Sequence, residues 1–356
     1  MGLLGGKKPS IGLDIGSSTI KVTELRESKK GYQLANFGMV SIPPEAIVDG
    51  AIMNTSAVED AIVSLLGERK IKTKDVVASV SGQSVMIRKI TMPAMTEEQL
   101  EEQIQWEAAQ YIPFEIADVN LDFQILNPGD EEGNMEVLLV AAKKEVINDY
   151  VTVLRDAGLN PVVIDVDAFA LLNMYEMNYP IMENEVVALV NIGASLINIV
   201  VLQGGRYVFS RDISMGGNLY TEEIQKQLSV SFEEAELLKK GGSRGEDTEE
   251  VMRKEVDMVI KEVSEQIAGE IARSLDFYSA ASPEAPINKI WLCGGSCRIS
   301  GLSEAIAKNQ NLPVEILNPF RNIEANPKLF DPAYLEEVGA QAAISVGLAL
   351  RRAGDR

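Results

Sequence analysis

Asp14-Ile-Gly-Ser-Ser-Thr-Ile-Lys21 decides the fold, because this stretch places a glycine- and serine-rich turn between two apolar segments. Glycine lets the backbone approach a phosphate closely, and the neighbouring hydroxyl and N–H groups can donate hydrogen bonds to its oxygens. Lys21 adds a positive charge, and Asp14 can hold the waters of a magnesium ion. The predicted phosphate contacts of the turn are Gly16, Ser17, Ser18, Thr19 and Lys21. An ordinary β-hairpin is the alternative; a Walker loop would require G-x4-G-K-[ST] before a helix.

Residues 191–198 repeat this pattern as Asn-Ile-Gly-Ala-Ser-Leu-Ile-Asn, with Ile, Gly, Ser and Ile at matching places. Glycines follow each copy, at Gly31 and at Gly204-Gly205, and introduce a further strand-like run. The repeat predicts a duplicated α/β protein whose two turns face each other across a cleft. The second turn supplies the predicted phosphate contacts Asn191, Gly193, Ala194 and Ser195.

A third turn, Leu292-Cys-Gly-Gly-Ser296, follows an apolar strand and precedes a predicted helix. Bare backbone at Gly294 and Gly295, next to Ser296, suits a flat base or a ribose, and a tight strand-to-helix turn is the alternative. Glu236 and Lys239 lie three residues apart on a predicted helix, so their side chains point to one side. They can contact a shared ligand there, or form a surface ion pair.

The composition of the 356-residue chain excludes several functions. Its formal net charge of −20 argues against binding nucleic acid or an anionic membrane surface, although solubility alone also explains such a charge. The chain has no histidine, which excludes histidine-based catalysis and histidine-ligated metals. Its two cysteines, Cys293 and Cys297, do not match a zinc site and fit a reducing cytosol.

The sequence predicts neither a secretory signal nor a membrane-spanning segment. Residues 1–8 lack the apolar core of a secretory signal. The longest apolar run, 186–202, is interrupted by Asn191, Gly193 and Asn198 and is too short to span a bilayer. We therefore expect a cytoplasmic protein without direct membrane insertion.

The chain is too long for one ordinary core, so more than one subdomain is expected. Residues 83–165 read as strand–helix–strand–strand–helix–strand, which is compact enough for an inserted subdomain, and a capping box at Thr96 and Gln99 starts its first helix. A polar loop is predicted at 240–247. The other predicted strands are 11–25, 32–42, 76–80, 186–201, 207–214 and 289–293, and the other helices 56–69, 168–177, 220–228, 232–239, 249–280, 302–309 and 338–350.

The order of these three turns resembles the superfamily of actin, sugar kinase and heat-shock-chaperone ATPases. Asp14–Lys21 and Asn191–Asn198 look like its two phosphate motifs, and Leu292–Ser296 looks like its adenosine motif. Val163–Ala170 and Gln341–Leu348 look like its connecting helices. The resemblance implies an actin-like (duplicated RNase H-like) fold that binds ATP and Mg²⁺, with Asp14 holding the metal through water. It also implies that Gly216, Gly217, Glu236 and Lys239 contact the nucleotide.

Three strings are similar to the PilM family, cytoplasmic actin-like components of type IV pilus assembly on the FtsA-like branch. They are Met92-Pro-Ala-Met95, Gln110-Tyr-Ile-Pro-Phe114 and Val166-Asp-Ala-Phe-Ala-Leu-Leu-Asn173. The sequence stops four residues after Arg352, which leaves no room for the membrane helix of FtsA and favours PilM.

The PilM resemblance implies a partner, the N-terminal cytoplasmic peptide of PilN. Through PilN the chain would join the PilN–PilO–PilP inner-membrane platform and link it to the motor ATPase. The resemblance implies that the peptide lies in a groove between two of the subdomains named below, 1A and 1C, and residues 81–86 and 99–114 are candidates for its walls. The cluster Trp106, Tyr111, Ile112 and Phe114 fits either a core, which we favour, or that groove.

The resemblance also implies four subdomains. Subdomain 1A comprises 1–82 and 166–185, with the C-terminal helix 338–352 packed against it, and 83–165 form an inserted 1C (SHS2-like) subdomain. Residues 186–215 and 288–337 form 2A, and 216–287 form 2B.

Two departures from the superfamily bear on catalysis. Asn191 stands where an Asp usually helps to organise magnesium, and no histidine can act as a base. Asp165 or Asp167 would have to orient water; Asp167 is the better candidate, although a helix N-cap also explains it. We therefore expect ATP to be a conformational ligand with slow or no hydrolysis. A sugar or acetate kinase and a filament-forming FtsA-like ATPase are the alternatives.

Overall fold

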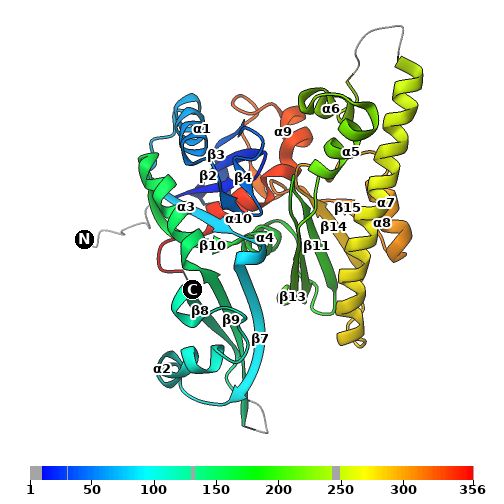
Figure 1. Cartoon of the computed structure of the whole chain (residues 1–356). Helices are drawn as coiled ribbons and strands as arrows, with labels where there is room; N and C mark the ends of the chain where they lie inside the picture. Colours follow the sequence, from blue (N-terminus) through cyan, green and yellow to red (C-terminus); the bar gives the residue numbers. More distant parts are fainter. Residues whose placement is uncertain (1–9, 30, 130–132, 243–248, 356) are drawn as a thin grey trace.

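The computed structural model describes residues 10–29, 31–129, 133–242 and 249–355. The N-terminal residues 1–8 and residues 243–247 of the predicted polar loop lie outside these ranges. Two α/β lobes stand side by side, and a smaller sheet projects from the first lobe (Figure 1).

The first lobe is built on a six-stranded sheet in the order β10-β6-β1-β2-β3-β16. β1 runs antiparallel to β2 and parallel to β6, and β6 runs parallel to β10. The strands are β1 (Ile11–Ile15), β2 (Thr19–Ser28), β3 (Gly31–Ser41), β6 (Asp75–Val80), β10 (Asn160–Val166) and β16 (Ile323–Glu324).

The second lobe repeats this arrangement in a five-stranded sheet, β13-β12-β11-β14-β15. β11 is again antiparallel to β12 and parallel to β14. Asp14 pairs with Lys21 and Asn191 with Asn198, so the two turns occupy equivalent places and the predicted duplication is confirmed. The strands are β11 (Val186–Ile192), β12 (Ile197–Gln203), β13 (Arg206–Ile213), β14 (Lys289–Cys293) and β15 (Val314–Ile316).

Two helices, α4 (Asp167–Asn178) and α10 (Ala343–Leu350), cross between the sheets (Figure 1). The predicted connecting helix at 163–170 is wrong in its first half, because β-branched Val163 and Ile164 continue β10 as far as Val166. The predicted C-terminal helix at 338–350 is interrupted. α9 (Pro332–Val338) ends where a 3₁₀ turn, Gly339–Ala342, leads into α10.

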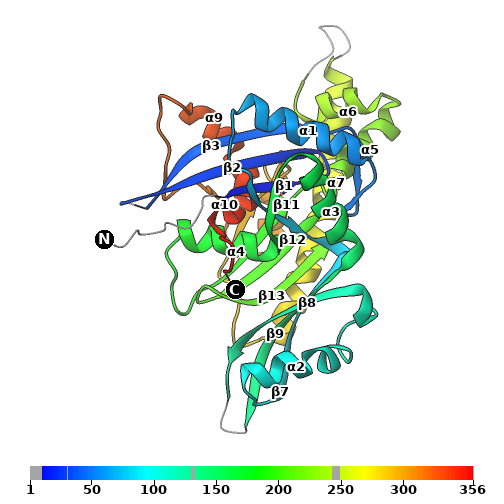
Figure 2. The same ribbon diagram turned by 90° about the vertical axis from the view of Figure 1, so that its left-hand side faces the viewer.

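The three-stranded sheet β7-β9-β8 carries its own core beside the first lobe (Figure 2). Thr96 and Gln99 form the predicted capping box at the start of α2. The core interpretation of the aromatic cluster holds for Ile112 but is wrong for Trp106 and Tyr111, which are 80% and 41% exposed. The elements are β7 (Val85–Pro93), α2 (Glu97–Ala108), β8 (Val119–Asn127), β9 (Asn134–Lys143) and α3 (Lys144–Asp156).

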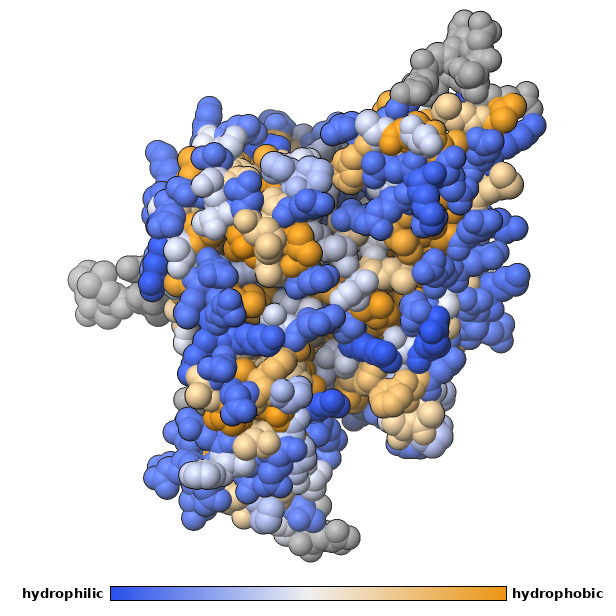
Figure 3. Space-filling model, viewed as in Figure 1, coloured by the Kyte–Doolittle hydropathy of each residue, from blue (hydrophilic) through white to orange (hydrophobic). Residues whose placement is uncertain are grey.

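α1 lies against the first sheet and α7 and α8 lie against the second, whereas α5 and α6 pack on each other and on α7 (Figure 1). Within the described ranges, no helix combines the length and the apolar character needed to span a bilayer. On the face shown in Figure 3, hydrophobic residues lie in separate patches among hydrophilic ones. The remaining elements are α1 (Thr55–Glu68), α5 (Asn218–Leu228), α6 (Phe232–Lys239), α7 (Glu249–Ala281), α8 (Leu302–Gln310), β4 (Ile47–Val48) and β5 (Ala51–Ile52).

Candidate functional site

A cavity of about 860 Å³ lies between the lobes, and all three predicted turns line it. This volume is within the usual range for a small-molecule site. The structure brings nearly every predicted site residue to this cavity. They are Asp14, Gly16, Ser17, Ser18, Thr19, Lys21, Asp167, Asn191, Gly193, Ala194, Ser195, Gly217, Glu236, Lys239, Gly294, Gly295 and Ser296. Gly216 is instead packed beneath the second turn, against the carbonyl oxygens of Gly193 and Ala194.

The two turns predicted to contact phosphate face each other, as expected from the duplication. Ser195 Oγ donates a hydrogen bond to Ser17 Oγ across the cleft, at 2.7 Å. Gly16 and Gly193 each turn their backbone so that the N–H donates within the turn, to the carbonyls of Thr19 and Leu196. A Cβ atom at Gly193 would lie 2.9 Å from the Leu196 carbonyl oxygen, so this tight turn requires glycine.

Lys21 forms an ion pair with Asp14, with Nζ 3.0 Å from Oδ2. Both side chains are largely buried at the base of the first turn. The pair therefore offers a preorganised cation for an anionic ligand and a carboxylate for the waters of a divalent ion. An ordinary surface hairpin does not need such a buried pair.

Asp167 lies at the edge where parallel strands β6 and β10 end, beside the first turn. Ser79 Oγ donates to Asp167 Oδ1 at 2.6 Å. Asp167 is the first residue of α4 and Val166 is the N-cap, so the N-cap interpretation is wrong. Burial, with a further contribution from Asp14, raises the pKa of Asp167 to about 7, against the opposing hydrogen bonds from Ser79 and Ser81. The group can thus change protonation near neutral pH.

Asp167→Asn is expected to stabilise the protein above pH 7 and to have little effect near pH 4. The folded protein holds this proton up to about pH 7, whereas an ordinary Asp carboxyl has a pKa of 3.8, so ionisation of the wild-type carboxyl opposes folding at higher pH. The expected gain is about 1–2 kcal/mol at pH 8, after allowance for the solvent that reaches this half-buried group. Urea unfolding at pH 8, 6 and 4.5 measures it.

Asp60→Asn, at an exposed position of α1, is the matched control and should leave stability unchanged at each pH. A constant difference between Asp167→Asn and wild type across the three pH values would contradict the raised pKa.

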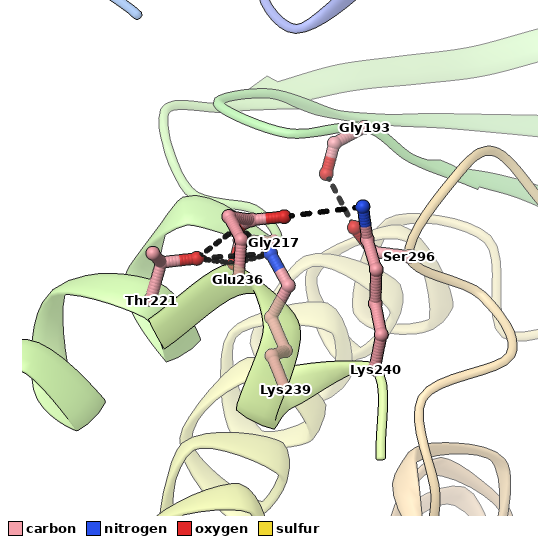
Figure 4. A network of polar contacts seen from close by, with 7 residues as sticks. All are labelled: Gly193, Gly217, Thr221, Glu236, Lys239, Lys240 and Ser296. Atoms are coloured by element: carbon pink, nitrogen blue, oxygen red, sulfur yellow. Dashed lines mark hydrogen bonds and ion pairs between the residues drawn. The ribbon is translucent and has the colours of Figure 1, made fainter. Parts of the chain in front are cut away.

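Glu236 and Lys239 form a network at the second lobe's side of the cavity (Figure 4). Thr221 Oγ1 donates to Glu236, which also pairs with Lys239, and Lys239 Nζ donates to the Gly217 carbonyl oxygen at 3.2 Å. Burial raises the pKa of Glu236, but the bonds from Lys239 and Thr221 outweigh it and leave the pKa below its ordinary value. The two residues are both an ion pair and part of the cavity wall.

At the place where the three turns meet, two glycines have no room for a side chain. A Cβ atom at Gly294 would lie 2.6 Å from Asn191 Oδ1, and one at Gly217 would overlap Ser296 Oγ. Ser296 Oγ donates to the Gly193 carbonyl oxygen at 3.1 Å. These contacts tie the third turn to the second.

The residues present fit a nucleotide with a magnesium ion. The glycine cradle, the hydroxyl-rich turns and Lys21 suit phosphate, and Asp14 suits a hydrated cation. Within the described part of the chain, no cluster of three or more acidic or cysteine side chains could hold a metal ion directly.

Sequence reasoning missed Ser79, Asn198, Asp212 and Thr221. Ser79 could have been found, because it lies near the carboxyl end of the apolar strand β6, which runs parallel to β1. The carboxyl ends of parallel strands lie at the same edge of a sheet, which is where ligands bind in such folds. Asp212 had no comparable signal, since its partners lie on β12 and on Gly82.

Comparisons with known proteins agree with this geometry. The family described as "Type IV pilus assembly protein PilM" matches residues 12–353. A solved structure described as a PilM-PilN type IV pilus biogenesis complex contains a chain 29% identical, with a TM-score of 0.84, covering 97% of this chain and 99% of that one.

Two ethanolamine utilization proteins EutJ are more distantly similar. The structure from Carboxydothermus hydrogenoformans is 14% identical, with a TM-score of 0.57 over 97% of this chain and 90% of that one, which shows a shared fold. The protein from Escherichia coli (strain K12) is 29% identical over 119 residues, 33% of this chain and 37% of that protein. The match thus spans little more than a third of that relative. The fold is the actin-like ATPase fold, and the chain belongs to the PilM family of type IV pilus assembly proteins.

Proposed function

We propose that this chain is a cytoplasmic adaptor that binds ATP with Mg²⁺ in the cavity between the lobes and captures the N-terminal cytoplasmic peptide of PilN. Through PilN it would sit at the inner membrane beneath the PilN–PilO–PilP complex and link that platform to the pilus motor ATPase. It would make no direct contact with nucleic acid and would not insert into the membrane.

The proposal that the cavity binds a nucleotide rests on one observation, the two turns that face each other. Ser17 and Ser195 lie within hydrogen-bond distance across the cleft, so one polyphosphate can contact both turns. Lys21 and the turn N–H groups would hold the phosphates, Asp14 the waters of magnesium, and Gly217, Glu236, Lys239 and Gly294–Ser296 the adenosine. Magnesium would neutralise phosphate charge when bound.

ATP acts here as a conformational ligand, with slow or no hydrolysis. The Asn191 side chain carries no charge, and its amide already donates to Asn198 Oδ1 at 2.8 Å. The raised pKa of Asp167, about 7, would still let this residue orient or deprotonate a water, so the expectation of slow hydrolysis rests on Asn191. A phosphate-release assay should give turnover close to background. Robust release that Asp14→Ala abolishes would contradict this.

A second hollow of about 410 Å³ supports the peptide part. It lies beside the start of β7 and is lined by most of the first predicted groove wall, namely Ser81, Gly82, Gln83, Val85 and Met86, together with Phe209–Asp212 of β13 and Phe277. Residues 99–114, the other predicted wall, do not contribute to its lining as described. The full-length similarity to the chain in the PilM-PilN structure favours PilN as the occupant.

Fluorescence anisotropy with a labelled N-terminal peptide of the PilN from the same organism tests the adaptor role. We expect saturable binding in the presence of Mg-ATP, and none of a scrambled peptide. Equal binding of both peptides, or of neither, would leave only a nucleotide-binding actin-like protein.

A filament-forming, FtsA-like protein is the second candidate, since the fold permits polymerisation. Sedimentation with Mg-ATP distinguishes them, because the adaptor should stay in the supernatant. For the subdomains we propose the division given above: 1A at 1–82 and 166–185, 1C at 83–165, 2A at 186–215 and 288–337, and 2B at 216–287.

A further inference from the structure

A chain of polar side chains leads from the nucleotide cavity to the second hollow. Asn191 Nδ2 donates to Asn198 Oδ1 at 2.8 Å, and Asn198 Nδ2 donates to Asp212 Oδ1 at 2.9 Å. The other oxygen of that carboxylate, Oδ2, accepts the backbone N–H of Gly82 at 2.6 Å. Asn191 and Asn198 line the first cavity, and Asp212 and Gly82 line the second.

The Asp212 carboxylate sets the direction of every bond in this chain. A carboxylate only accepts, so Asn198 must turn its amide nitrogen toward Asp212 and its oxygen toward Asn191. Asn191 must then donate, and its own oxygen faces the Cys293 thiol, 3.8 Å away. An Asp at position 191 could not make this donation. The geometry thus accounts for an Asn at the second phosphate turn.

The last bond of the chain joins the two lobes. Gly82 follows β6 of the first lobe, and Asp212 lies on β13 of the second. Next to this bond, Gln83 Nε2 lies 3.5 Å from Ser214 Oγ, and a Cβ at Gly82 would lie 3.7 Å from the side chain of Leu196 in the second phosphate turn. The first residues of β7, which wall the second hollow, follow Gly82 within three positions. A change in the distance between the lobes therefore acts directly on this wall.

We propose that Asp212 is a positioning residue that latches the lobes at Gly82 and couples the nucleotide turns to the partner-binding hollow. The coupling to a bound peptide rests on the proposed function, whereas the bond between the lobes at Gly82 does not. A ligand that bridges the facing turns sets the lobe separation, and the Asp212–Gly82 bond passes that separation to β7. Asp212 is exposed on the side of the hollow, so its carboxylate is also within reach of solvent and of a bound peptide.

Hydrogen–deuterium exchange of the whole protein, with and without Mg-AMPPNP, tests the latch without any peptide. In the wild type, nucleotide should slow exchange in the segment 80–88 by about fivefold or more, because a ligand that holds the lobes together keeps the Gly82 amide bonded to Asp212 for more of the time. In Asp212→Asn the response should fall below about twofold, since an amide has one acceptor oxygen for two donors. Asn191→Asp should act in the same direction.

Asp75→Asn is the matched control. Asn160 Nδ2 donates to Asp75 Oδ1 at 2.7 Å, the same pair of groups at the first residues of β10 and β6, so loss of this bond should leave the response of 80–88 intact. Thermal melting checks that each variant is folded. If nucleotide leaves the exchange rate of segment 80–88 unchanged in the wild type, or slows it as much in Asp212→Asn as in the wild type, the proposed latch is wrong.

Titration of the labelled PilN peptide is the second arm. In the wild type, saturating Mg-AMPPNP should change the peptide Kd by about 5-fold or more, and in Asp212→Asn by less than about twofold. Failure of the peptide to bind any variant would refute the proposed function and leave the exchange result to decide the latch. Peptide binding with equal nucleotide effects in both proteins would refute the latch alone.

Discussion

Replacing Gly347 with alanine is expected to destabilise the protein by about 3 kcal/mol or more, or to prevent folding. A Cβ at this position of α10 would lie 2.9 Å from the Cα of Ala170 in α4 and closer still to its carbonyl oxygen. The opposite side of α10 is equally tight, because a Cβ at Gly12 of β1 would lie 2.9 Å from the backbone carbon of Leu348. Backbone atoms on both sides leave the helix no room to shift.

Gly269→Ala is the control for this prediction. Gly269 also lies within a helix, α7, but nothing is within 4 Å of where its Cβ would stand. That substitution should stabilise the protein by about 0.5–1 kcal/mol, because alanine favours the helix. Urea unfolding followed by circular dichroism measures both. A Gly347→Ala protein within 1 kcal/mol of wild type would show that the two helices can separate at little cost.

Lys21→Ala is expected to weaken Mg-AMPPNP binding by about 100-fold. The substitution removes the positive charge of the first turn and also leaves Asp14, 3.0 Å from Nζ in the wild type, as an unbalanced negative charge facing the phosphates. Both effects oppose an anionic ligand. Isothermal titration calorimetry measures the change.

Lys226→Ala removes a lysine whose side chain is 75% exposed on α5 and pairs only weakly with Glu223. Its nucleotide affinity should match the wild type. If Lys21→Ala and Lys226→Ala bind the nucleotide with equal affinity, the first turn is an ordinary β-hairpin that does not contact phosphate.

The duplication was predictable because the repeated turn is local in sequence and its flanking strands are strongly apolar. Gly16 and Gly193 mark the turns, and strand pairing then brings Asp14 opposite Lys21 and Asn191 opposite Asn198. The parallel strands β6 and β10 place Asp167 at the same edge of the sheet as the first turn. The helices and strands could therefore be predicted from local sequence patterns.

Features that depend on tertiary packing were not predictable. Trp106 carries the hydrophobicity of a core residue, but α2 buries Leu100 and Ile104 on its other face and leaves the indole exposed. The 3₁₀ turn before α10 was not predictable either, since residues 338–350 are mostly apolar and their path is determined by the close approach to β1 and α4. Asp212 acquires its role from a partner 130 residues away.

The nucleotide content of the protein tests the central claim most directly. The purified chain is incubated with Mg-ATP at neutral pH, separated rapidly from free nucleotide, and the bound nucleotide is identified by anion-exchange chromatography. The geometry predicts about one nucleotide per chain, recovered as intact ATP after hours, because Lys21 and the facing turns hold the phosphates while the uncharged Asn191 does not help to organise magnesium for hydrolysis. Recovery of ADP within minutes, or of no nucleotide at all, would contradict it.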